Sequence, residues 1–203
     1  MRKNNKKSTL KEDIENFENG TISLNDLMGT LRIVSIVGTI FNAVIMFVIV
    51  VYSILCLFTA KAVPREELVN NESFINYVSR INNYYHEEAQ REVLAYKDTS
   101  LMVINEVVLP TTCVFIGFVG LIILCRYLYD FTKNVSSYKT LFTKNKLGQI
   151  KQIRNVGAVS SILIWLTLGE VYMLLWALFI IIMEIIIYMF SFCIDLVDKK
   201  QEG

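Results

Sequence analysis

Glu184 is the residue whose type and position could most directly do chemistry in this sequence. It lies near the middle of a long apolar stretch, between isoleucine runs. A carboxyl group at the centre of a bilayer costs about 3 kcal/mol on insertion scales, and such groups usually face the interior of a helix bundle, where they mark an ion, proton or substrate path. We expect no Lys or Arg at its depth, so burial would keep the carboxyl protonated.

Partners for Glu184 at similar depth are predicted to be Asn42, Ser160 and Ser161. Two interpretations stay open. Glu184 is either a titratable site on a transport path, or a protonated side chain that only holds helices together by a hydrogen bond.

A second candidate region is the basic segment, residues 126–154. It carries one acid, Asp130, and seven basic residues, Arg126, Lys133, Lys139, Lys144, Lys146, Lys151 and Arg154. Basic side chains near a membrane surface each gain about 1 kcal/mol from anionic lipid. We therefore predict a contact with anionic lipid or with a cytosolic partner, made by Lys144, Lys146, Lys151 and Arg154. The charges are sparse and no base-reading motif accompanies them, so nucleic-acid binding is not predicted.

Motifs for catalysis and cofactor binding are missing from the sequence. Residues 86–90, His-Glu-Glu-Ala-Gln, begin like a zinc-protease motif but have Gln90 where the second histidine is needed, and His86 is the only histidine. No phosphate loop, dinucleotide fingerprint or nucleophile elbow occurs. All four cysteines lie in apolar runs without a Cys-x-x-Cys pair, so neither a disulfide framework nor a zinc site is expected. We predict a non-enzymatic protein with no cofactor.

Composition and hydropathy indicate what positions these residues. The 203-residue chain is 54% hydrophobic with a mean hydropathy of +0.45, which is typical of a membrane protein with polar loops. We predict an all-α membrane protein, a four-transmembrane-helix bundle with an extracytoplasmic helical loop between spans one and two. The spans are residues 31–60, 107–128, 155–168 and 171–197. The remaining segments are a tail, residues 1–30, the loop, residues 61–106, the basic cytoplasmic part, residues 129–154, and a second tail, residues 198–203.

The last two spans are inferred from length. Residues 156–197 would form a helix of about 60 Å, twice the hydrocarbon core of about 30 Å. Gly169, between Leu168 and Glu170, is the best place for a turn. Gly157 and Ser161 favour close packing within the bundle, and self-association into a homo-oligomer is the alternative.

Helices are also expected outside the spans. The loop contains a helical stripe made of Phe74, Val78, Ile81 and Tyr85. It has five basic and eight acidic residues and is therefore net negative. In the first tail, a capping box at Thr9 starts a short stripe of apolar residues, which favours a surface helix, with a solvated tail as the alternative.

Lys and Arg near span ends predict orientation, because such residues accumulate on the cytoplasmic side. Both tails and the basic segment carry them, whereas the Gly169 turn does not. Four spans put all three Lys-bearing segments on one side, so both termini are predicted to be cytoplasmic. Three spans would place Lys199 and Lys200 outside.

The basic segment also carries a family-like pattern. It contains Phe142-Thr143, Asn145, Leu147, Ile150 and Ile153 before the third span. In this pattern it resembles a family of small bacterial four-span membrane proteins without an assigned function. The resemblance implies a bacterial inner membrane, in some cases a neighbouring helix-turn-helix regulator, and no activity.

These observations lead to two functional hypotheses. The first is a polytopic bacterial cell-membrane protein with an accessory, sensory or regulatory role. The alternative is a small transporter or immunity-type membrane protein that uses Glu184 as a titratable site.

Overall fold

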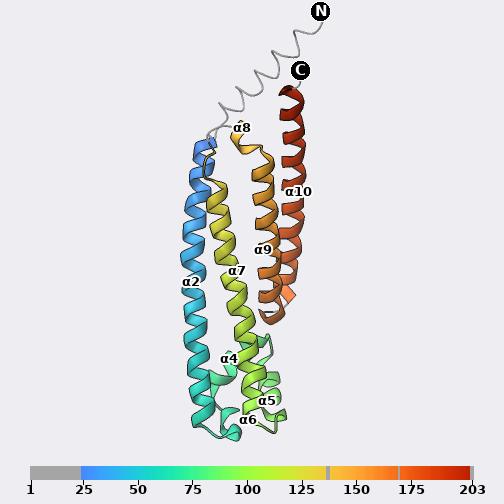
Figure 1. Ribbon diagram of the computed structural model, residues 1–203. Coiled ribbons are helices and arrows are strands. Elements are labelled where there is room, and N and C mark those ends of the chain that lie inside the picture. The colour runs from blue at the N-terminus through green and yellow to red at the C-terminus, as the bar shows by residue number, and fades with distance from the viewer. Residues whose placement is uncertain (1–23, 136–137, 169, 202–203) are drawn as a thin grey trace, which may run out of the picture.

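Four long helices lie side by side in the computed structural model, which describes residues 24–135, 138–168 and 170–201 (Figure 1). Everything regular in these ranges is helical. The elements are α2 (Leu24–Ala62), α3 (Arg65–Leu68), α4 (Glu72–Asn82), α5 (His86–Ala95), α6 (Thr99–Val103), the π-helical turn η1 (Ile104–Val108), α7 (Leu109–Phe131), α8 (Tyr138–Leu141), α9 (Lys144–Leu168) and α10 (Glu170–Gln201). The surface helix predicted around Thr9 lies outside the described residues.

The long helices form a row rather than a closed bundle. α2 packs mainly on α7, α7 packs on α9, and α10 packs mainly on α9. Measured along the helix axes, the first residues of α2 and the last residues of α10 lie at the same end of the molecule, at the top of the view in Figure 1. The two outer helices therefore leave long apolar faces exposed, as expected where lipid takes the place of a protein core.

Three helices of the described chain are long and apolar enough to cross a membrane. They are Leu24–Ala62, Thr99–Phe131 and Trp176–Leu196. The predicted all-α membrane class is thereby confirmed. The third predicted span, residues 155–168, is helical as part of α9. The first half of α9 is polar, so this helix is not apolar over the length needed to cross a membrane. Length and composition thus identify three candidate spans among the described residues, and the fourth predicted span is not confirmed.

Within the described residues, α9 ends at Leu168 and α10 begins at Glu170, and the two helices pack against each other. Gly169, where the turn was predicted, lies outside the described residues. The last residues of α9 and the first residues of α10 do not reach as far down the molecule as the end of α2 and the start of α7 do (Figure 1). α2 alone has 39 residues, about 58 Å, and so extends well beyond a hydrocarbon core of about 30 Å.

The short helices α3 to α6 form a unit that we call the cap. The cap lies beyond the connected ends of α9 and α10 and packs around the C-terminal end of α2 and the N-terminal end of α7 (Figure 1). As predicted, Phe74, Val78 and Ile81 of α4 are buried. Tyr85 is 86% exposed, so its place in that stripe was wrong. The reason is local: Asn83 adopts a left-handed conformation with φ 57° and ends the helix before Tyr85.

The entry into α7 is shaped by Pro110. Proline has no N–H to donate to the carbonyl four residues earlier, which belongs to Glu106. The chain forms the π-helical turn η1 here, and Asn82 Nδ2 of α4 donates to the Glu106 carbonyl oxygen at 2.9 Å. The cap is thus bonded to the backbone of the spanning helix at the point where proline weakens it.

Close approach between α7 and α9 depends on glycine. A Cβ on Gly120 would lie 2.0 Å from Ser160 Oγ and 3.0 Å from Ser160 Cβ, and a Cβ on Gly117 would lie 3.1 Å from the Ser160 carbonyl oxygen. Ser160 itself is 2% exposed. The two backbones therefore meet as in other small-residue helix contacts.

Gly120→Ala is expected to destabilise the protein by about 1–2 kcal/mol, because Ser160 is too short to move aside and overpacking separates the helices. Thermal unfolding in detergent would measure the loss. Gly148→Ala is the matched control, since no atom lies within 4 Å of the position of its Cβ and alanine favours helix. An equal or more stable Gly120→Ala protein would contradict the α7–α9 packing.

Candidate functional site

Lys146 belongs to a polar junction at the C-terminal end of α7, and not to the exposed surface predicted for it. Its side chain is 7% exposed. Its Nζ donates to the Phe131 carbonyl oxygen and, at 2.9 Å, to that of Lys133. It also lies 5.2 Å from the centre of the Phe131 ring. A lipid or cytosolic partner therefore cannot use this amine, and the prediction for Lys146 was wrong.

Arg32 completes the junction from α2. Its Nε and Nη2 donate to the hydroxyl and the carbonyl oxygen of Thr132, at 3.0 and 2.9 Å, and Thr132 is fully buried. Three consecutive carbonyls, of residues 131 to 133, are thus bonded by cations from two other helices. The last carbonyls of a helix lack backbone donors and carry its negative dipole end, so two cations stabilise this end strongly.

Burial lowers the pKa of Lys146, and the nearby Asp130 carboxylate opposes that shift. Asp130 itself pairs with Lys133 at 2.7 Å and lies 3.9 Å from Arg126. The end of α7 is therefore a small charge network in which each ion has a neighbour of opposite sign or a carbonyl.

Glu184 is paired, in contrast to the expectation that it has no basic neighbour. Arg154 Nη1 of α9 lies 2.5 Å from Glu184 Oε1 of α10, and the two side chains are 28% and 54% exposed. The other two donors of the guanidinium bond Asn155 Oδ1 at 3.0 and 2.8 Å. Arg154, predicted to contact lipid or a partner, is thus occupied within the chain, and an ionised Glu184 has its counter-ion.

The depth of this ion pair follows from helix register. Residues 107–125, from the end of η1 into α7, carry no charge and span about 28 Å, the thickness of a hydrocarbon core. A Cβ on Gly157 would lie 2.7 Å from Leu124 Cδ1, so Arg154, one turn earlier on antiparallel α9, lies level with the residues just after Cys125. Glu184 therefore sits at the basic end of the charge-free layer and not at its centre. Sequence reasoning missed this because α10 continues past that layer.

The polar residues proposed as partners of Glu184 bond elsewhere. Asn42 Nδ2 donates to the Gly38 carbonyl oxygen within α2 at 2.8 Å. Ser160 Oγ donates to the Val156 carbonyl oxygen at 2.7 Å and faces α7. Ser161 is half-buried on α9, and the ion-pair partner of Glu184 is Arg154 instead. The predicted four-residue intramembrane site is not assembled, because α2 lies at the opposite edge of the row from α10 (Figure 1).

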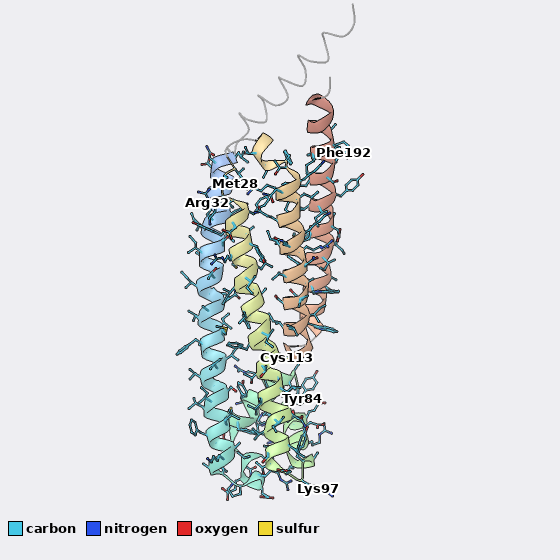
Figure 2. The ribbon with its side chains drawn as sticks, in the orientation of Figure 1. Met28, Arg32, Tyr84, Lys97, Cys113 and Phe192 are labelled. Carbon is cyan, nitrogen blue, oxygen red and sulfur yellow. The ribbon has the colours of Figure 1, made fainter. Side chains whose placement is uncertain are left out.

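Lys144 and Lys151 are the two predicted contact residues that remain exposed. Both belong to the first half of α9. This part of α9 lies at the same end of the molecule, along the helix axes, as Met28 and Arg32 of α2 and Phe192 of α10 (Figure 2). Of the four basic residues, these two are exposed, and Lys151 is the one whose contact with lipid or a partner stays a prediction on that ground.

The π-helical turn η1, next to the cap, holds a buried carboxyl that sequence reasoning placed only at a loop end. Glu106 is 4% exposed. Its Oε1 accepts a hydrogen bond from Tyr96 OH at 2.7 Å, whereas its Oε2 is buried without a hydrogen-bond partner. The hydrogen bond to Glu106 raises the pKa of Tyr96, and burial together with the Glu106, Glu92 and Glu88 carboxylates raises that of Tyr84.

The structure gives no support for metal or thiol chemistry in the described part of the chain. No three His, Cys, Asp or Glu side chains gather there. His86 is exposed, and Gln90 donates to the Val69 carbonyl oxygen at 3.1 Å as part of the cap. All four cysteines are free thiols, with Cys56 buried.

Two residues with buried polar contacts, Arg32 and Glu106, were thus missed from the sequence. Arg32 looked like part of the first span, although an arginine at the start of an apolar run is a usual sign of a membrane boundary. Glu106 looked like a loop residue, and the signal that could have found it was Pro110, since the residue four before a proline needs an outside donor for its carbonyl.

Comparisons of the chain with protein-family models, curated proteins and solved structures return no match. The resemblance of residues 142–154 to small bacterial four-span proteins therefore stays a prediction.

Proposed function

We propose that this protein is a non-enzymatic accessory or sensory component of a bacterial cell membrane, in which α2 and α7 couple the cap to the basic segment. One observation carries the proposal. Both helices run unbroken from contacts with the cap to the junction of Arg32, Thr132 and Lys146. A rigid helix transmits a shift at one end to the other, provided that both ends have discrete packing arrangements.

The proposal includes four spans, with α9 as the third. Support comes from its packing along α7 and from the position of its polar residues. Ser160 faces α7, and the charge of Arg154 is met by Glu184. α9 thus needs no aqueous surface within the bilayer. Both termini and the basic segment are then cytoplasmic, and the cap lies outside.

Cysteine labelling tests this topology. In a chain whose native cysteines are replaced by serine, we expect Lys97→Cys to react with an impermeant maleimide on whole cells. Lys151→Cys and Gly203→Cys should react only after the membrane is opened. Labelling of Gly203→Cys and Lys97→Cys from the same side would reject four spans.

Coupling is tested by loosening the cap and observing the opposite end. Asn82→Ala removes the donor to Glu106 and should raise the rate of tryptic cleavage at Lys144 and Lys151 about threefold in inverted vesicles. The exposed cap residue His86, changed to Ala, is the matched control. Unchanged cleavage in Asn82→Ala, with a loosened cap shown by faster hydrogen exchange, would reject transmission.

The alternative is a small transporter or immunity-type protein using Glu184. The half-exposed carboxyl within an apolar helix favours it. The ion pair with Arg154 favours the accessory role, because the Glu184 carboxylate is already bound to a cation of the chain and is not open to a transported ion.

A further inference from the structure

A groove lies between α2 and α4, where the cap rests on the spanning helices. Its volume is about 460 Å³. One wall is apolar and comes from α2, and the other carries polar groups of α4; the lining includes Val48, Ile49, Tyr52, Asn76, Tyr77 and Arg80. Val48 and Tyr52 are 45% and 55% exposed, so the apolar wall continues onto the open face of α2.

The groove lies at the cap-side boundary of the membrane. Tyr77 OH, on its α4 wall, is 2.6 Å from Thr111 Oγ1 of α7. Thr111 comes about one turn after the start of the charge-free residues 107–125, which span the hydrocarbon core. The polar wall thus lies about one turn inside the cap-side edge of that layer, where a side chain as long as Arg80 reaches a lipid headgroup, and the apolar wall meets the acyl chains.

Arg80 gives the groove a positive charge. Its guanidinium has no ion-pair or hydrogen-bond partner among the described residues, and Glu72, the acidic residue of its own helix, lies two turns away. Asn76 and Ser73 add polar groups on the same wall. A guanidinium binds the oxygens of a phosphate through parallel N–H donors, and more strongly than it binds water.

We infer that the α2–α4 groove binds a phospholipid with an anionic headgroup from the cap-side leaflet. The headgroup phosphate contacts Arg80 and Asn76, and an acyl chain lies against Val48 and Tyr52. Two features favour a lipid over a free anion: the apolar wall, and its continuation along the exposed face of α2. This site requires only that α2 and α7 lie in a bilayer, so it does not depend on which side the cap faces.

The test uses the full-length protein in nanodiscs made from equal parts of phosphatidylglycerol and phosphatidylcholine, followed by native mass spectrometry of retained lipid. We expect wild-type protein to retain phosphatidylglycerol preferentially and Arg80→Gln to lose that preference about tenfold. Arg91→Gln, an exposed arginine of α5 outside the groove, is the matched control and should behave as wild type. Val48→Trp fills the apolar wall and should also reduce retention.

Three outcomes would overturn the inference. They are equal phosphatidylglycerol retention by wild type and Arg80→Gln, an equal loss in Arg91→Gln, and displacement of the lipid by millimolar inorganic phosphate. The last would identify a free-anion site. Circular dichroism of each variant distinguishes these outcomes from unfolding, since Arg80 and Val48 are both exposed.

Discussion

Lys146→Met is expected to destabilise the protein by about 3 kcal/mol and to lower its Tm by roughly 10 °C. Methionine fills the same volume but leaves the buried carbonyls of Phe131 and Lys133 without the donors that Lys146 Nζ supplies. An unsatisfied buried acceptor costs the full desolvation of that group, about 1–3 kcal/mol. The measurement is thermal or denaturant unfolding in a detergent micelle.

Lys151→Met is the control for the Lys146 experiment. Lys151 is exposed on the same helix, one turn away, so its loss should change the Tm by less than about 2 °C. The contrast separates a general effect of charge on α9 from the specific bonds at the end of α7. Equal Tm values for the two variants would show that Lys146 is not part of the junction.

Arg154→Met is the second large effect that we expect, a loss of about 2 kcal/mol. It leaves Glu184 without its counter-ion on an apolar helix, and removing one partner of an ion pair costs more than removing both. The partial exposure of both side chains keeps the figure below that of a fully buried pair.

The double variant Arg154→Met/Glu184→Met completes the cycle. It should recover most of the stability lost in Arg154→Met, because no lone charge remains. Additive losses in the double variant would mean that the two side chains do not interact.

Glu184→Gln also separates the two functional hypotheses. An accessory protein should keep its phenotype, whereas a transporter that uses this carboxyl should lose activity.

Local sequence determined the helices and their faces. The apolar runs predicted helices long enough to span a membrane, the length of the last run predicted two helices in place of one, and Phe74, Val78 and Ile81 predicted the buried face of α4. These features follow from periodicity and from the backbone properties of single residues, which a sequence displays directly. The prediction for Tyr85 was wrong because Asn83 adopts a left-handed backbone conformation and ends helix α4 before Tyr85.

Tertiary structure decided which charged side chains are buried or paired across helices and which are exposed. Lys144, Lys146, Lys151 and Arg154 look alike in the sequence, yet two are occupied by α7 carbonyls and by Glu184, and two are exposed. Their roles depend on the register between helices, which the close contact of Gly120 with Ser160 sets. A contact between residues 30 positions apart, such as Arg154 with Glu184, has no local signal. The sequence alone therefore determined that the chain has helices apolar and long enough to cross a membrane, and only their packing determined which contacts their charged residues make.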